Sequence, residues 1–254
     1  MSLLRVENLT KSFGGLMAVN EVSFTVDKDS IVGLIGPNGA GKTTVFNLIT
    51  GNYQPNAGTV EFDGVSLIGL PTHTIVEHGI ARTFQTIRLF QNMTVLENTL
   101  AGCHCRMRSG ALAAMLRTPS QRREEEKALE QAMAELSFVG LAHEWRNKAK
   151  NLSYGNQRLL EIARALATQP KLIVLDEPAG GMNDQETQEL IQLIRNIQNR
   201  GITVLLIEHD MGLVMRVCSS LVVLEHGAVI ASGTPAEIQA NPRVIEAYLG
   251  VDSE

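Results

Sequence analysis

The sequence predicts an α/β fold in which a core built on a parallel sheet carries an antiparallel β portion and an inserted helical lobe. Residues 31–35 and 172–175 are continuous apolar runs, which are typical of strands buried on both faces of a parallel sheet. Residues 22–26 and 60–62 instead alternate apolar with polar side chains, as half-buried antiparallel strands do. From about residue 85 to 169 the pattern is helical with little strand character, which indicates the lobe.

The N-terminal part predicts strands around one helix. Leu3–Leu9 is expected to form the first strand, and residues 11–15 the turn that leads to the second. A helix is expected from Thr44 to Thr50, because Gly51 is the type of residue that closes helices. Residues 60–62 predict an edge strand that ends at an Asp-Gly turn.

The lobe is expected to contain at least two helices. Thr94-Val95-Leu96-Glu97 fits a capping box, so a helix begins there and runs towards Arg106. A stretch interrupted by Gly and Pro follows, Ser109–Ser120. The second helix is predicted by apolar residues at helical spacing, which are Ala128, Leu129, Ala132, Met133 and Leu136.

The α/β pattern returns after the lobe. Asn183–Glu186 can cap a helix, and the apolar run 202–207 predicts another strand. Residues 221–231 fit a hairpin, the capping box Thr234–Glu237 begins a helix, and Pro242 begins the last one. We therefore assign the chain to one domain, with 1–84 and 170–254 as the α/β core and about 85–169 as the helical lobe.

Composition narrows the class of protein. The net charge is −5 without a basic stripe, so nucleic acid is not an expected partner. The apolar runs are too short to cross a bilayer, and no signal peptide follows Met1. Three cysteines make no disulfide framework, and Cys103-His104-Cys105 lacks a second pair of metal ligands. We expect a cytosolic protein that can dock on a membrane protein.

A glycine-rich motif follows the apolar run 31–35. Residues 36–43 match G-x-x-x-x-G-K-[ST] between a predicted strand and a predicted helix. Glycines let backbone N–H groups turn towards phosphate oxygens, and the helix N-terminus adds positive potential. Lys42 can hold the β- and γ-phosphates, and the Thr43 hydroxyl can ligate Mg²⁺. The motif predicts a nucleoside triphosphate site made of Gly36, Pro37, Asn38, Gly39, Ala40, Gly41, Lys42, Thr43 and Thr44.

A second motif, Asp176-Glu177, ends the apolar run 172–175. Ligands bind at the carboxyl ends of strands in open parallel sheets, so these carboxylates are expected beside the phosphates. Asp176 can hold Mg²⁺ through water. Glu177 can orient and deprotonate the attacking water, and general-base help of this kind contributes on the order of 10²–10⁴ in rate.

A third motif lies in the lobe. Leu152-Ser153-Tyr154-Gly155-Asn156-Gln157 resembles the L-S-G-G-Q signature of ATP-binding cassette (ABC) ATPases, with Tyr154 and Asn156 in place of Gly and Gln. A Ser hydroxyl and a Gly N–H at a helix N-terminus make an anion site. The resemblance implies that Ser153, Gly155 and Asn156 contact ATP held by a second subunit. Two ATP molecules would then lie between the subunits of a head-to-tail dimer.

The same resemblance implies roles for further residues. Phe13 matches the aromatic that stacks on adenine, Gln85 the glutamine that senses Mg²⁺, and His209 the histidine that contacts the γ-phosphate. Gly180–Asn183 matches the D-loop, which acts across the dimer, and Asn183 replaces a frequent Asp there. The implied catalytic residues are Lys42, Gln85, Glu177 and His209, and the implied Mg²⁺ ligands are Thr43, Gln85 and Asp176.

The resemblance covers essentially the whole chain and extends to a subfamily. Segments 13–19, 82–90, 205–211 and 247–250 are similar to the ATPase subunits of branched-chain amino-acid importers. This likeness implies an ATP hydrolase on the cytoplasmic face of the membrane. Its implied partners are transmembrane permease subunits, a second ABC ATPase and, indirectly, a periplasmic substrate-binding protein. The expected docking surface is Gln85–Glu97 with Phe84.

Three alternatives compete with this interpretation. One is the ATPase of another ABC transporter, such as the similarly short lipopolysaccharide-export type. A second is a soluble ABC ATPase of translation or DNA repair, which usually has two cassettes or a long coiled-coil insertion. The third is a GTPase, whose guanine-reading N-K-x-D motif is absent because Asn147-Lys148-Ala149-Lys150 lacks the Asp.

Overall fold

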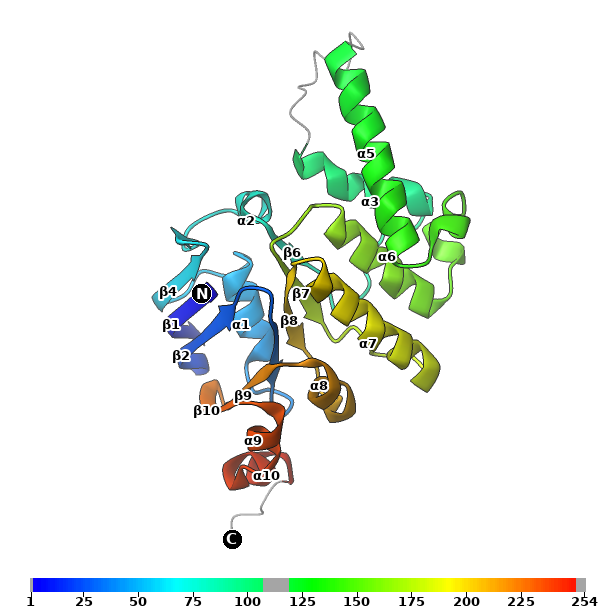
Figure 1. Cartoon of the computed structure of the whole chain (residues 1–254). Coiled ribbons are helices and arrows are strands. Elements are labelled where there is room, and N and C mark those ends of the chain that lie inside the picture. The colour runs from blue at the N-terminus through cyan, green and yellow to red at the C-terminus, as the bar shows by residue number, and fades with distance from the viewer. Residues whose placement is uncertain (1, 107–118, 250–254) are drawn as a thin grey trace.

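The structure, a computed structural model, describes residues 2–106 and 119–249, which form two β-sheets (Figure 1). The central sheet has the strand order β10-β9-β3-β8-β7-β6. Its strands pair in parallel except β10, which forms an antiparallel hairpin with β9. The strands are β3 (Ile31–Ile35), β6 (Ile80–Arg82), β7 (Leu172–Asp176), β8 (Thr203–Ile207), β9 (Ser220–Glu225) and β10 (Ala228–Gly233).

The second sheet is antiparallel and has the order β2-β1-β4-β5. Its strands are β1 (Ser2–Phe13), β2 (Leu16–Asp27), β4 (Ala57–Phe62) and β5 (Val65–Ser66). The prediction of an edge strand at residues 60–62 is wrong, because β4 lies between β1 and β5. The turn after Phe62 leads straight back into β5, so this two-residue strand forms the edge instead.

The central sheet separates two apolar cores. Side chains on one face, such as Val32 and Val174, pack with helix α1 (Lys42–Ile49) and the antiparallel sheet. Side chains on the other face, such as Ile31 and Ile173, pack with helices α6, α7 and α8. Because both faces are covered, every residue of β3, β7 and β8 is buried, which explains their unbroken apolar runs. Figure 1 shows α1 between the two sheets.

Three helices gather at one end of the molecule, and α5 extends away from the sheets (Figure 1). They are α3 (Val95–Cys103), α5 (Pro119–Phe138) and α6 (Tyr154–Leu166). The 3-10 helices η1 (His104–Arg106), η2 (Ala142–Glu144) and η3 (Ala149–Asn151) connect or extend them. Of the predicted interrupted stretch, Pro119 and Ser120 begin α5, and residues 109–118 lie outside the described part of the chain.

The remaining helices are α2 (Thr72–His78), α7 (Asp184–Asn199), α8 (Met211–Val217), α9 (Pro235–Gln239) and α10 (Pro242–Leu249). The predicted caps of three helices are confirmed, since Thr94, Asn183 and Thr234 each form both halves of a capping box. No sequence pattern predicted α2, α8 or the short strands β5 and β6. In residues 2–106 and 119–249, no helix is long and apolar enough to span a bilayer.

Candidate functional site

Four loops leave the same edge of the central sheet. The strand register aligns Leu34 with Ile207 and Asp176 with Ile207, so the carboxyl ends of β3, β8 and β7 are neighbours. β6 lies beyond β7 and pairs Arg82 with Val174. The glycine loop, Glu177, His209 and Gln85 follow these strands, so the sheet topology gathers residues that are far apart in the sequence.

Glycine is required at two positions of the glycine loop. Gly36 has φ +148°, and a Cβ there would lie 2.1 Å from the carbonyl oxygen of Leu224. Gly41 has φ +97°, and its Cβ would lie 2.5 Å from the carbonyl oxygen of Ala18. The loop therefore depends on residues that approach neighbouring backbone closely and adopt conformations that other side chains rarely take.

Lys42 begins α1 directly after this loop and turns back over it. The buried ammonium donates to the carbonyl oxygens of Gly36 at 2.6 Å and Pro37 at 3.0 Å. Burial lowers the pKa of Lys42, and the charges of Glu177 and Asp176 act in the opposite direction. The exposed Thr43 follows in the first helical turn. A cation and a helix N-terminus thus face one loop, which suits phosphate groups.

Three predicted catalytic side chains meet at Glu177. The Gln85 amide donates to Glu177 Oε2 at 3.0 Å, and His209 Nδ1 lies 3.8 Å from Glu177 Oε1. The Glu177 backbone has φ +46°, and its N–H donates to the carbonyl oxygen of Ile207 at 2.8 Å. This left-handed conformation costs a non-glycine residue about 1–2 kcal/mol. The hydrogen bonds that hold Glu177 in place therefore have to offset this strain.

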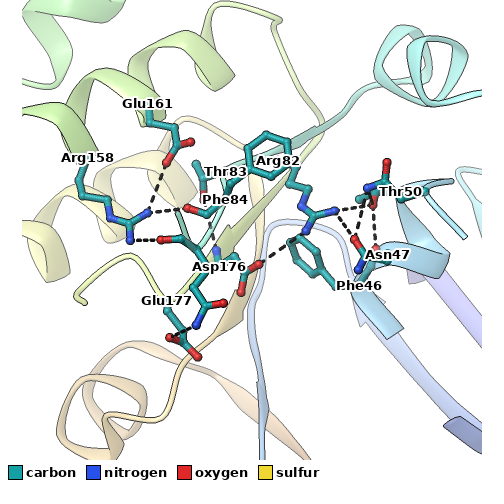
Figure 2. A network of polar contacts seen from close by, with 12 residues as sticks. Phe46, Asn47, Thr50, Arg82, Thr83, Phe84, Arg158, Glu161, Asp176 and Glu177 are labelled. Atoms are coloured by element: carbon teal, nitrogen blue, oxygen red, sulfur yellow. Dashed lines mark hydrogen bonds and ion pairs between the residues drawn. The ribbon is translucent and has the colours of Figure 1, made fainter. Parts of the chain in front are cut away.

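Asp176 belongs to a buried network that sequence analysis did not find. Figure 2 shows Arg82 between Asp176 on one side and Asn47 and Thr50 on the other. The guanidinium lies 3.7 Å from Asp176 Oδ2, and its carbon lies 4.3 Å from the centroid of the Phe46 ring. Burial raises the pKa of Asp176, and the positive charge of Arg82 opposes that rise. Arg82 begins the segment 82–90 that resembles branched-chain importers, but no sequence pattern predicts its ion pair, because a single Arg in a short strand is common.

The donor set fits Mg²⁺ bound together with phosphate. Thr43, Gln85 and Asp176 each carry a side-chain oxygen of the kind that Mg²⁺ prefers, and all three follow or end strands at this edge of the sheet. Within the described ranges, no cluster of three or more His, Cys, Asp or Glu residues could hold a metal alone.

The third motif begins α6. Ser153 caps this helix by accepting a hydrogen bond from the Asn156 N–H at 3.2 Å. A Cβ on Gly155 would lie 2.6 Å from Glu186 Oε1, so a larger residue there would have to displace the Glu186 carboxylate, which accepts the Asn183 N–H. The Tyr154 ring lies against Gly181, where an added Cβ would be 2.9 Å from the ring. The motif is therefore packed against the segment 180–183.

Arg158, a second residue that sequence analysis missed, links α6 to the segment that carries Gln85. Figure 2 shows its guanidinium donating to the carbonyl oxygen of Phe84. The guanidinium also donates to the carbonyl oxygen of Gln85, and to the Tyr154 hydroxyl at 3.0 Å. It also lies 3.4 Å from Glu161 Oε2. Arg158 and Glu161 are 4% and 1% exposed, so this pair is shielded from water. Burial raises the pKa of Glu161.

Phe13 and Ser153 lie outside the cluster around Glu177. Phe13 ends β1 in the antiparallel sheet, is 43% exposed, and packs edge-on against Tyr53 with 5.2 Å between ring centroids. Its exposure leaves a ring face available for stacking. The roles assigned to Phe13 and Ser153 remain predictions, because they concern a bound nucleotide.

Comparisons with known proteins agree with this geometry. Residues 19–180 match the family model described as ABC transporter, and residues 228–254 match one described as branched-chain amino acid ATP-binding cassette transporter. The branched-chain amino acid transport ATP-binding protein LivG of Escherichia coli is 49% identical over 249 residues, 98% of each chain. The crystal structure of the ADP conformation of MJ1267, an ATP-binding cassette of an ABC transporter, has TM-score 0.86 and 37% identity, and covers 99% of this chain and 100% of its own.

The lipopolysaccharide export ATP-binding protein LptB of Haemophilus influenzae is a more distant relative. It is 36% identical over 250 residues, again 98% of each chain. The lower identity and the match at residues 228–254 both favour the branched-chain group over the export group.

Proposed function

Because the chain belongs to the ATP-binding cassette transporter family, we propose that it powers a membrane importer of branched-chain amino acids. It is an ATPase of the ABC class that binds and hydrolyses ATP. The observation that carries the substrate proposal is the 49% identity to LivG along almost the whole chain, supported by the C-terminal family match.

Nucleotide binding is assigned to the glycine loop. The loop amides and Lys42 hold the phosphates, and Phe13 stacks on the adenine. Thr43, Gln85 and Asp176 would hold Mg²⁺, which would supply positive charge beside the phosphates when bound. The Lys42 ammonium has three N–H donors and gives two of them to the carbonyl oxygens of Gly36 and Pro37, so the third can bind a phosphate oxygen.

Hydrolysis is assigned to the cluster around Glu177. Its carboxylate orients the attacking water and accepts its proton, while Gln85 holds that carboxylate by its amide. His209 lies on the other side of the carboxylate and contacts the γ-phosphate. This assignment is supported by the contacts of Gln85 and His209 with Glu177, because three different loops bring these side chains together at one edge of the sheet.

Productive hydrolysis needs a second cassette. Ser153, Gly155 and Asn156 of that cassette close over the γ-phosphate, so each ATP lies between two subunits. The replacement of Gly by Tyr154 is compatible with this role, because its hydroxyl bonds Arg158 and its ring packs on Gly181. Asn183 is compatible with the D-loop role, because its side-chain amide caps α7 without needing a charge.

The membrane partner docks beside the lobe. A groove of about 370 Å³ opens between α2, β6, α3 and α6, and its lining includes Ile75, Phe84 and Phe90. Phe90 is 53% exposed, and Arg88 stacks on Phe84 with its guanidinium carbon 4.6 Å from the ring centroid. An apolar floor with a basic rim suits a short amphipathic helix of a permease subunit.

Movement of the helical lobe transmits the closure of the two cassettes around ATP to the permease subunit. We propose that residues of about 85–169 shift as a unit against the core formed by 1–84 and 170–254. Arg158 ties α6 to the backbone at Gln85, which lies at the start of the docking surface. The protein then works at the cytoplasmic face of the membrane, with permease subunits, a second ABC ATPase and, indirectly, a periplasmic substrate-binding protein.

Uptake in the native organism tests this function. Replacing the gene with a Glu177→Gln allele should abolish ATP-driven uptake of labelled leucine, isoleucine and valine, while proline uptake stays normal. Affinity capture of the same tagged variant with ATP and Mg²⁺ should recover two polytopic membrane proteins and a second short ATPase. Normal uptake of all three amino acids, or recovery of lipopolysaccharide-export components, would contradict the substrate proposal.

A further inference from the structure

A buried carboxylate next to His209 has no role in the steps above. Glu208 is 0% exposed and follows β8 directly. Its Oε1 accepts the Ala179 N–H at 3.0 Å, and its Oε2 accepts the N–H groups of His209 at 3.1 Å and Asp210 at 3.3 Å. One side chain therefore binds backbone from two loops that are about thirty residues apart in the sequence.

The two loops are those that carry the proposed catalytic pair. Ala179 lies two residues after Glu177, at the start of the turn that leads to the D-loop. His209 Nδ1 lies 3.7 Å from Glu208 Oε2 and 3.8 Å from Glu177 Oε1, so the imidazole sits between two carboxylates. Oε1 of Glu208 thus binds the loop that follows Glu177, and Oε2 binds the loop that carries His209.

An ionised Glu208 side chain suits these hydrogen bonds. A carboxylate accepts hydrogen bonds at both oxygens, and three backbone N–H donors converge on Glu208. Burial raises its pKa, and the three N–H donors oppose that rise. A carboxylate rather than an amide is needed, because the NH₂ group of Gln would face a backbone N–H whichever way it turned.

We propose that Glu208 is a positioning residue for ATP hydrolysis, which acts by holding the loops of Glu177 and His209 at a fixed separation. This inference rests on the catalytic roles proposed for those two residues. Glu208 touches neither nucleotide nor water in this mechanism. Its loss should therefore lower the rate of the hydrolytic step and leave the binding of ATP to the glycine loop unchanged.

The test compares Glu208→Gln with a matched control in the purified protein. Glu135 is also a buried carboxylate with several hydrogen bonds, from Arg200 at 2.6 and 2.7 Å and from Gln131, but it lies in the lobe helix α5. Glu208→Gln should lower kcat at least tenfold with the Kd for ATP within twofold of wild type. Glu135→Gln should lower the melting temperature and leave both constants within twofold.

A double-variant cycle separates this inference from the proposed function. If Glu208 acts through Glu177, adding Glu208→Gln to Glu177→Gln should lower the residual rate by less than threefold. A kcat for Glu208→Gln within twofold of wild type, or a parallel loss of ATP affinity, would overturn the positioning role. Full hydrolysis by Glu177→Gln alone would instead overturn the proposed catalytic role of Glu177. If Glu208→Gln does not fold, Glu208→Asp, which keeps the charge but is one methylene shorter, makes the same comparison.

Discussion

Replacement of Arg82 by Ala should destabilise the protein more than any exposed charge substitution. The change removes a guanidinium that stacks on the rings of Phe46 and Phe84, at 4.3 and 4.8 Å, and bonds Asn47 at 2.7 Å. It also removes the cation that acts most strongly on buried Asp176, and leaves the weaker effect of Arg158. The Arg82 and Asp176 side chains are 12% and 3% exposed, so their ion pair is nearly shielded from water. Removing one partner of such a buried pair is expected to lower the free energy of unfolding by roughly 3–5 kcal/mol.

The loss should depend on pH. Burial raises the pKa of Asp176 and Arg82 opposes the rise, so Arg82→Ala raises this pKa further. A raised carboxyl pKa destabilises the folded state only while the carboxyl is ionised. The stability difference from wild type should therefore be largest at neutral pH and shrink as the pH falls through the raised pKa.

Urea denaturation at neutral pH and at an acidic pH at which the protein still folds measures both effects. Arg5→Ala is the control, because Arg5 and Glu7 form an exposed pair with 57% and 54% side-chain exposure. Such a pair contributes about 0–1 kcal/mol. A loss for Arg82→Ala no larger than that of Arg5→Ala, or one equal at both pH values, would refute the buried-network argument.

Three further variants test the site. Glu177→Gln should retain ATP binding and lower the steady-state hydrolysis rate on the order of 10²–10⁴-fold. An ATP-bound dimer should be visible by size-exclusion chromatography. Hydrolysis at the wild-type rate would exclude a general base at this position. Lys42→Ala should weaken ATP binding at least tenfold by fluorescence titration, because the phosphates lose their cation; unchanged affinity would contradict the assignment. Ser153→Arg should leave monomer affinity unchanged and abolish dimer formation by light scattering, since a bulky cation occupies the anion site; a normal dimer would argue against the signature role.

Local patterns made much of the fold predictable from sequence. The continuous apolar runs of β3, β7 and β8 follow from burial on both faces, and capping boxes mark their own helix starts. The short elements β6, α2 and α8 were missed, because three to seven residues are too few to establish a period. The prediction that β4 is an edge strand was wrong because β5, the strand on its outer side, has only two residues.

The sequence by itself determined which residues have the chemistry of the site. Glycines at Gly36 and Gly41, the Lys42-Thr43 pair and the acidic pair at a strand end are recognisable from residue type and spacing. These signals are local, because a phosphate loop is built from consecutive residues at a strand-to-helix junction. The meeting of Gln85, Glu177 and His209 was expected only from family resemblance, since three separate loops supply them.

Tertiary structure alone decided how those residues are held. Arg82, Arg158 and Glu208 are single charged residues with no repeating pattern around them, and a charged residue at such a position is usually exposed. The folded arrangement leaves all three side chains little exposed and gives each a partner from a distant segment. A buried charge needs a compensating partner, and only the folded arrangement of the strands determines which segment supplies it.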